Sequence, residues 1–404
     1  MTRTQTRPSP LGELDTDAIE NVYLFIADSV RYDCVPDRVV DRGRLFKTAA
    51  AALCTPQSVP SIVTGRHAPR HGVTWFNDSL NESLPTLFDL DATTGYNEVV
   101  WEGRAVNDIL NEPGRIDLES VEEPFVALEH DNGGHSPYVD SKNQSTAEMF
   151  SNISDERELR RRYRETVAAS TDRFEERLDV LEDQDLLEST LVIYLADHGE
   201  LLGEHGGFVG HGLPAAPEVA YVPTVFIHES LASETAETFI HHTDLFPTID
   251  HLVDDGRTSA SADGDSLLEV VDADRPAYTQ GVMRPQEKYR GTILDPNYDA
   301  PSIWTKHGGF VFNDTSKLVL PLTATFDALF SGYTGAFNDS NFRPAVLARA
   351  LRHYLSGEQT YGTPSVSRTD ARAMADQLSS ITVETESRSL DEETKEHLEQ
   401  LGYR

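Results

Sequence analysis

The chain alternates short apolar runs with longer segments that mix apolar and charged side chains. Apolar runs of a few residues between polar residues are typical of strands buried in a parallel sheet. Residues 154–185 instead carry apolar side chains at helical spacing, as in an amphipathic helix that covers a sheet. This alternation predicts an α/β fold with a mostly parallel sheet and helices on both faces. The predicted strands are 22–27, 98–101, 124–128, 191–195 and 222–227.

The pattern changes after about residue 275. Apolar residues 309–312 and 317–320 flank a polar turn, which predicts a β-hairpin. Helices are expected at 342–355 and 391–401, and the charged, Ser/Thr-rich segment 361–388 is expected to be a loop. Because 404 residues exceed the size at which a single core stops growing, we expect two units. The catalytic α/β domain would span residues 1–275 and a C-terminal subdomain residues 276–404.

Two of the predicted strands end in possible metal ligands. Asp28 follows the first strand, and Asp197, His198 and Gly199 follow the strand at 191–195. The carboxyl ends of parallel strands meet at one edge of a sheet, where α/β enzymes place their active sites. Carboxylates and imidazole together bind divalent metal ions. The pattern therefore predicts a metal site at this edge.

A third segment contains Cys54, Thr55 and Pro56 and lies just before Thr64-Gly65-Arg66. With the two strand ends, it resembles the sulfatase branch of the alkaline phosphatase superfamily. Further matches are His135-Ser136-Pro137-Tyr138, Thr243-Asp244-Leu245-Phe246-Pro247-Thr248 and Leu398-Glu399-Gln400-Leu401-Gly402-Tyr403. The resemblance implies an alkaline-phosphatase-like α/β/α sandwich with a mostly parallel central sheet and a small C-terminal antiparallel subdomain. It also implies a metal-dependent hydrolase of phosphate or sulfate esters.

The nucleophile segment departs from the sulfatase pattern. Sulfatases carry Cys-x-Pro-Ser-Arg, whose cysteine is oxidised to formylglycine, whereas here Gln57 and Ser58 follow Pro56 and the arginine is missing. Thr55 lies ten residues before Gly65, the position of the family's nucleophile. This resembles superfamily members that use an unmodified threonine, and an alcohol suits phosphoryl transfer. We interpret Thr55 as the nucleophile; a formylglycine sulfatase that uses Cys54 is the alternative.

The resemblance assigns roles to the remaining motif residues. Asp28, Thr55, Asp197 and His198 are expected to hold one divalent metal ion. An imidazole ligand favours Mn²⁺ or Zn²⁺ over Ca²⁺. His135 and His211 are expected to stabilise the transferred group or to protonate the leaving oxygen, although His211 lies one residue beyond the family's usual spacing. Asp131 and His135 also resemble half of a second metal site, which stays an open alternative.

Other histidines are expected to be structural. They are His71, His205, and the group His241, His242 and His251, which we place on a helix. We expect a second helix to begin at Ser58, with Pro60 in its first turn, and to direct its N–H groups at a bound oxyanion. We expect Arg160, Arg161 and Arg162 to lie on a solvent-exposed face of a helix.

The amino-acid composition limits the kinds of partner that we expect for this protein. The 68 acidic and 34 basic residues give a formal net charge of −34, which excludes nucleic acid and anionic membranes as expected partners. Such acidity is typical of adaptation to high salt. The sequence shows neither a signal-peptide core nor a transmembrane run, so we expect a cytoplasmic protein. Two cysteines argue against a disulfide framework.

The expected substrate is a small-molecule or glycan ester. Sulfate and phosphate, and monoester and diester, stay open, as does the oligomeric state. Two further alternatives are a glycan-directed phosphotransferase and a metal-binding homologue without catalysis.

Overall fold

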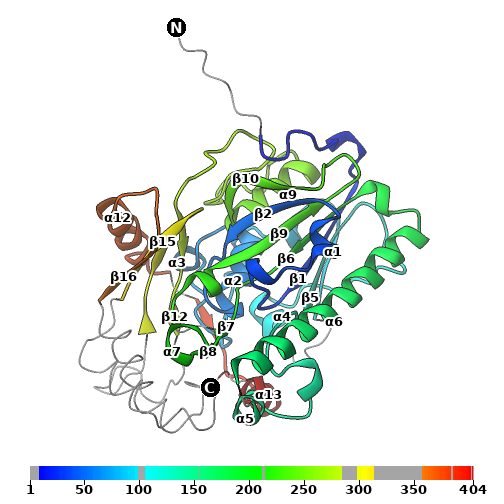
Figure 1. Cartoon of the computed structure of the whole chain (residues 1–404). Coiled ribbons are helices and arrows are strands. Elements are labelled where there is room, and N and C mark those ends of the chain that lie inside the picture. The colour runs from blue at the N-terminus through cyan, green and yellow to red at the C-terminus, as the bar shows by residue number, and fades with distance from the viewer. Residues whose placement is uncertain are drawn as a thin grey trace.

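A seven-stranded sheet forms the centre of the computed structural model (Figure 1). The structure describes residues 9–98, 105–153, 155–211, 214–283, 298–313, 357–383, 385–401 and 403. The strand order is β10-β2-β9-β6-β1-β5-β4. Only β9 runs antiparallel to its neighbours among these strands, so the predicted mostly parallel sheet is confirmed. The strands are β1 (Asn21–Ala27), β2 (Arg44–Ala49), β4 (Thr93–Glu98), β5 (Phe125–Asp131), β6 (Thr190–Leu195), β9 (Tyr221–Ile227) and β10 (Glu234–His241).

The predicted strands at 22–27, 124–128, 191–195 and 222–227 match β1, β5, β6 and β9. The strand predicted at 98–101 shares only Glu98 with β4, and residues 99–101 lie outside the described part. Sequence reasoning missed β2 and β10. β10 is an edge strand whose first residues are largely exposed, so it lacks the apolar run by which a buried strand is recognised.

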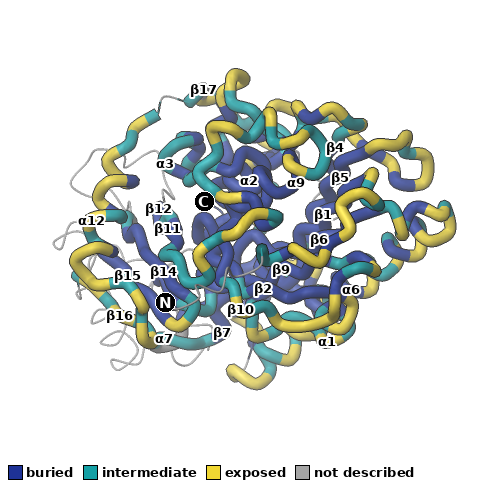
Figure 2. The backbone as a smooth tube through the Cα atoms, turned by 90° about the horizontal axis from the view of Figure 1, so that it is seen from above, coloured by how far each residue is buried: buried dark blue, intermediate teal, exposed yellow. Residues whose placement is uncertain are grey.

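Helices cover both faces of the sheet, as the two hydrophobic clusters show. Successive side chains of a strand point to opposite faces. Leu24 of β1 packs in the cluster that contains α2 (Thr55–Thr64), α4 (Ala105–Ile109) and α9 (Leu245–Val253). Phe25 packs in the other cluster, with α6 (Glu156–Asp183). Figure 2 shows the central strands as buried, with exposed backbone in the outer elements. This arrangement confirms the α/β/α sandwich.

A separate antiparallel sheet has the order β11-β14-β15-β16. Its strands are β11 (Ala277–Thr279), β14 (Ser302–Thr305), β15 (Gly308–Phe312) and β16 (Glu358–Gly362), and α12 (Arg368–Ser379) packs against it. The small C-terminal antiparallel sheet is therefore confirmed. The domain boundary at residue 275 stays a prediction.

The C-terminal predictions had mixed outcomes. β15 contains the predicted first arm of the hairpin, 309–312, but it pairs with β14 and β16. The predicted second arm, 317–320, and the helix at 342–355 lie outside the described residues. The loop predicted at 361–388 was wrong, because it contains α12. Ser367 caps this helix by accepting a hydrogen bond from the Asp370 N–H at 3.1 Å. The helix predicted at 391–401 is α13 (Glu392–Leu401).

Short elements complete the described part of the chain. The helices are α1 (Asp37–Val40), α3 (Ala68–His71), α5 (Thr146–Asn152), α7 (Glu204–Gly207) and α8 (Pro217–Ala220). The strands are β3 (Asp78–Ser79), β7 (Leu201–Leu202), β8 (Val209–Gly210), β12 (Val282–Met283), β13 (Tyr298–Asp299) and β17 (Glu386–Ser387). Within the described ranges, we find no helix with the length and apolar character needed to span a bilayer.

Candidate active site

Three neighbouring strands deliver side chains to one edge of the main sheet. β1 pairs in parallel with β6 on one side and β5 on the other. Asp28 follows β1 directly, and Asp197 lies two residues beyond β6. Gly133, with φ +47°, lets the chain after β5 pass close to β1, since a Cβ there would lie 2.1 Å from the Asp28 carbonyl oxygen. The Gly134 N–H then donates to that carbonyl at 2.7 Å and leads the chain to His135.

The structure brings all four predicted metal ligands together. Asp28, Asp197 and His198 each offer a ligand atom within 4.8 Å of the others, and all three are fully buried. Thr55, the first residue of α2, places Oγ1 3.3 Å from Asp28 Oδ2 and 3.2 Å from His198 Nε2.

The residues fit a divalent cation. Asp197 Oδ2 is buried and has no hydrogen-bond partner within the described chain. In the same described part, Asp28 and Asp197 pair only with histidines and not with lysine or arginine. Two carboxylates buried side by side, with no lysine or arginine to pair with them, are costly. A metal ion would offset that cost, and two carboxylates, an imidazole and a hydroxyl form a suitable donor set.

His135 and His211 lie beside this cluster, as predicted. The two ring centroids are 4.9 Å apart, and His211 lies 4.3 Å from the ring of His198. The Nδ1–H of His135 donates to the carbonyl of Ser136, which leaves Nε2 directed into the site. Burial lowers the pKa of His135, and burial with the nearby charges of His198 and His135 lowers the pKa of His211 well below its usual value.

The Asp131 carboxylate forms an ion pair with Arg173. Arg173 donates from Nε and Nη2 to its two carboxylate oxygens, the second bond measuring 2.7 Å, and the Gly133 N–H adds a bond of 2.9 Å. This ion pair with α6 holds Asp131 as a structural residue. The arrangement does not favour the second metal site that the sequence left open.

Sequence reasoning missed two residues of the site. His130, on β5, places Nε2 3.5 Å from Asp28 Oδ2. Burial alone would lower its pKa, but the hydrogen bond and charge of Asp28 raise it to about 9. Tyr403 places Oη 3.5 Å from Thr55 Oγ1 and 3.2 Å from His135 Nε2. The neighbouring Asp131 could have drawn attention to His130. Tyr403 belongs to a C-terminal motif to which the sequence assigned no chemical role.

The local structure around Thr55 corrects one prediction. α2 begins at Thr55 and not at Ser58, so Pro60 lies inside the helix. The N–H groups of Gln57 and Ser58 donate to the Cys54 carbonyl at 3.3 and 3.1 Å and are not directed at an oxyanion. Cys54 is buried, and burial raises the pKa of its thiol, so it would be a poor thiolate nucleophile.

The remaining histidines contact protein groups. His71 Nε2 lies 3.0 Å from Ser61 Oγ on α2, and His205 Nε2 lies 2.8 Å from Glu218 Oε2. His242 Nε2–H donates to the Ala196 carbonyl at 2.9 Å. Placing His241 and His242 on a helix was wrong for His241, which ends β10, while His242 begins a 3₁₀ turn and His251 does lie on α9. These contacts fit structural roles.

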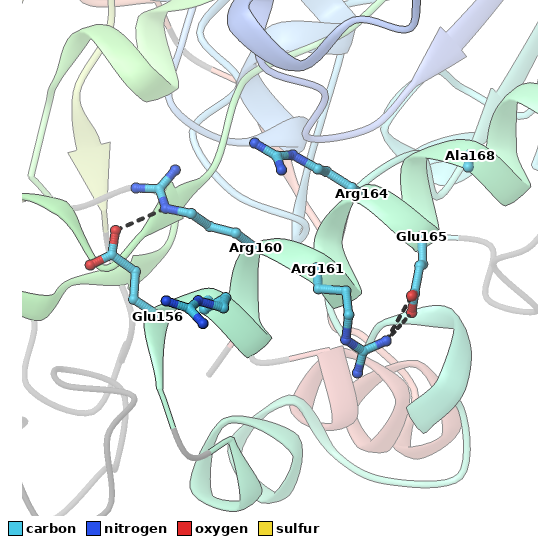
Figure 3. A pocket seen from close by; sticks show the side chains of 7 residues that line it. Glu156, Arg160, Arg161, Arg164, Glu165 and Ala168 are labelled. Atoms are coloured by element: carbon cyan, nitrogen blue, oxygen red, sulfur yellow. Dashed lines mark hydrogen bonds and ion pairs between the residues drawn. The ribbon is translucent and has the colours of Figure 1, made fainter.

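A separate open pocket of about 730 Å³ lies along α6 (Figure 3). It is lined by Glu156, Arg157, Arg160, Arg161, Arg164, Glu165 and Ala168. Arg160 Nε donates to Glu156 at 2.8 Å, and Arg161 Nη1 donates to Glu165 at 2.6 Å. These pairs between successive turns of one helix fit the solvated face expected there. None of the lining residues belongs to the cluster around Thr55.

Comparisons with known proteins agree with this arrangement. The family model described as Sulfatase matches residues 105–254. A Haloferax volcanii protein described as "Low-salt glycan biosynthesis sulfotransferase Agl7" is 33% identical over 409 residues, covering 98% of this chain and 99% of that protein.

Two solved structures illustrate the shared fold. A putative sulfatase from Bacteroides thetaiotaomicron has a TM-score of 0.59 at 13% identity, covering 93% of this chain and 96% of that one. The phosphonate monoester hydrolase of Agrobacterium radiobacter has a TM-score of 0.57 at 14% identity, covering 83% and 96%. At such identities these matches support the fold, while the family model and the full-length relative support membership. The chain belongs to the sulfatase family.

Proposed function

We propose that this chain is a metal-dependent enzyme that transfers a sulfuryl or phosphoryl group from an ester through Thr55. The observation that carries the proposal is the position of Thr55 Oγ1, 3.3 Å from Asp28 Oδ2 and 3.2 Å from His198 Nε2. A divalent cation held by Asp28, Asp197 and His198 would lower the pKa of a neighbouring hydroxyl and polarise the ester. Mn²⁺ or Zn²⁺ suits this donor set better than Ca²⁺.

In the first step, Thr55 Oγ forms a bond to sulfur or phosphorus and the bond to the leaving oxygen breaks. Thr55 loses its hydroxyl proton to solvent before the ester binds, and the leaving oxygen takes a proton from His135 or His211. Burial favours the neutral form of both histidines, but an anionic ester beside them would favour the protonated form. In the second step, an acceptor hydroxyl attacks the sulfur or phosphorus and the bond to Thr55 Oγ breaks. The proton of the acceptor passes to the same histidine, and Thr55 Oγ leaves as the alkoxide with which the first step began.

The acceptor distinguishes two candidate functions. With water the chain is a hydrolase; with a sugar hydroxyl it is a transferase. The 33% identity to a protein described as a glycan biosynthesis sulfotransferase, along nearly the whole of both chains, favours the glycan hydroxyl. Burial is consistent with this choice, since Thr55, Asp28 and His198 are fully buried and a site that excludes water protects a covalent intermediate from hydrolysis.

The nucleophile can be tested directly. The protein, loaded with Mn²⁺ or Zn²⁺, is assayed with paired aryl sulfate and aryl phosphate esters at low and high salt. We expect Thr55→Ala to abolish turnover and Cys54→Ala to retain it, with an unmodified thiol at Cys54 by peptide mass spectrometry. A formylglycine at position 54, or activity that survives Thr55→Ala and is lost in Cys54→Ala, would establish the sulfatase alternative.

The acceptor needs a second assay. The enzyme is incubated with an aryl sulfate donor and simple methyl glycosides, and the sugars are analysed by mass spectrometry. We expect a glycoside that has gained one sulfuryl group. Release of inorganic sulfate alone, at a rate independent of the glycoside concentration, would support the hydrolase. No turnover by wild type with any sulfate or phosphate ester would favour a metal-binding homologue without catalysis.

A further inference from the structure

The α13 helix is followed by a tyrosine whose side chain reaches the centre of the active site. Tyr403 Oη lies 3.5 Å from Thr55 Oγ1 and 3.2 Å from His135 Nε2. Its ring stacks on that of His135, with centroids 5.7 Å apart and planes inclined by 20°, and lies 5.3 Å from the ring of His211. One side chain therefore contacts three of the residues to which the proposed function assigns chemistry.

The protein holds Tyr403 in this position. Its N–H donates to the Leu398 carbonyl at 2.8 Å, which ties it to the end of α13. Its ring packs edge-on against Phe76 at 4.8 Å and Trp75 at 5.9 Å, and only 6% of the residue is exposed. It belongs to the same hydrophobic cluster as Val59 of the nucleophile helix. A side chain packed in this way is part of the site and is not a loose cover over it.

The position of the phenol indicates which atom it serves. In an in-line displacement, the leaving oxygen lies on the far side of the transferred group from the nucleophile, while negative charge spreads over the non-bridging oxygens. A donor 3.5 Å from Thr55 Oγ1 lies beside the nucleophile, within reach of a non-bridging oxygen. A phenol has an ordinary pKa of about 10, so Tyr403 keeps its proton at neutral pH and can act as a donor.

We propose that Tyr403 is a catalytic residue that donates a hydrogen bond from Oη to a non-bridging oxygen of the sulfuryl or phosphoryl group, while its ring fixes the orientation of His135. This inference rests on the proposed function of Thr55. A hydrogen-bond donor directed at developing charge contributes most when the site excludes water.

The test compares Tyr403→Phe with Tyr194→Phe. Phenylalanine keeps the ring and its packing on Phe76 and removes only the hydroxyl. Tyr194 is a matched control: it is fully buried, and its ring packs against Phe25 in the other hydrophobic cluster. Metal content and thermal unfolding of both variants establish that the fold and the metal site are intact.

We expect Tyr403→Phe to lower kcat by roughly 100-fold, as for the loss of one oxyanion donor, and by the same factor for nitrophenyl and phenyl esters. A loss that grows as the leaving group becomes more basic would identify a leaving-group acid and overturn the assignment. Orthovanadate provides a readout independent of the acceptor: its affinity for the metal-loaded protein should fall at least tenfold in Tyr403→Phe and stay unchanged in Tyr194→Phe.

The two proposals can fail separately. If Tyr403→Phe matches wild type in turnover and in vanadate affinity, while Thr55→Ala is inactive, the role of Tyr403 is wrong and that of Thr55 stands. If wild type neither turns over an ester nor binds vanadate, or if Thr55→Ala remains active, the proposed function itself is wrong.

Discussion

The edge of the main sheet and the outer face of α6 both gather charged side chains, in opposite environments. At the sheet edge, Asp28 and Asp197 are fully buried, and among described residues only histidines pair with them. On α6, the side chain of Arg161 is 55% exposed and that of its partner Glu165 is 49% exposed. Exposed pairs of this kind are close to neutral for stability, whereas buried charges without a partner are expensive. The fold retains the expensive arrangement at the sheet edge, where a metal site would explain it, so burial identifies the candidate site better than charge density does.

The largest expected effect comes from removing one buried charge. Asp197→Asn keeps the shape of the side chain and removes a proposed metal ligand, so we expect loss of the bound metal and at least a 1,000-fold loss of turnover, since a Lewis acid supplies several kcal/mol. Elemental analysis after dialysis should give one metal ion per wild-type chain and none in the variant. Two equivalents of zinc in wild type would contradict the single-metal site.

The same variant sharpens the comparison between the two regions. In the presence of a chelator, Asp197→Asn should unfold at a higher temperature than wild type, because it removes a buried negative charge whose Oδ2 has no hydrogen-bond partner among the described residues. With metal added, the order should reverse, since the metal stabilises only the protein that binds it. A variant less stable than wild type under both conditions would mean that Asp197 supports the fold without a metal.

A smaller effect is expected at His135. His135→Ala should retain the metal and lose rate by roughly 100- to 10,000-fold, the range for a lost general acid or base. Ring stacking with Tyr403 makes the substitution locally disruptive, so His135→Gln serves as the second variant. Both should bind one metal ion, and loss of the metal in both would place His135 among the ligands.

Much of the site could be predicted because its residues follow strands with clear apolar patterns. Asp28 and Asp197 each come just after a buried run, and parallel pairing brings such positions together whatever their separation along the chain. Tyr403 could not be predicted in this way. Its approach to Thr55 depends on the packing of its own ring against Phe76 and Trp75, and no local periodicity encodes that packing.

The fold shows the same division between local and long-range information. Buried strands such as β1 and β6 carry apolar side chains on both faces and are visible in the sequence. The edge strand β10 and the polar helix α12 obtain their conformation from tertiary contacts, in which Ala371 and Ala375 bury small side chains against the C-terminal sheet. Small residues in a charged segment resemble a loop until the surface that they cover is known.

The next smaller effect is a loss of stability at acid pH. It arises at His71, which contacts α2, the helix that begins at Thr55. Burial lowers the pKa of His71 to about 3, while the unfolded chain has the ordinary histidine value of about 6.5. As the pH falls, His71 is therefore protonated in the unfolded chain before it is protonated in the folded protein. Its contribution to the free energy of unfolding is complete above about pH 6.5 and is lost as the pH drops toward 3. At pH 4.5 the loss from this one residue is about 2–3 kcal/mol.

His71→Gln isolates this contribution. The variant is expected to be less stable than wild type at pH 7, because it loses the contact with Ser61, but its unfolding free energy should fall less between pH 7 and pH 4.5. Denaturant unfolding at both pH values, in high salt to screen the acidic surface, measures the difference. Equal falls in the two proteins would show that His71 does not titrate in this window.

The smallest effect is expected for substitutions on α6. A large effect there would contradict the contrast between the sheet edge and the outer face of α6. Arg161→Ala combined with Arg164→Ala removes two positive charges from the lining of the α6 pocket and touches no residue of the cluster around Thr55. Because Arg161 pairs with Glu165 at the surface and salt screens such charges, kcat and KM for aryl sulfate and phosphate esters should change less than about twofold. The double variant is assayed beside wild type at low and high salt. A tenfold rise in KM at low salt that disappears at high salt would show that these arginines attract the anionic substrate, and the pocket would then be part of the binding surface.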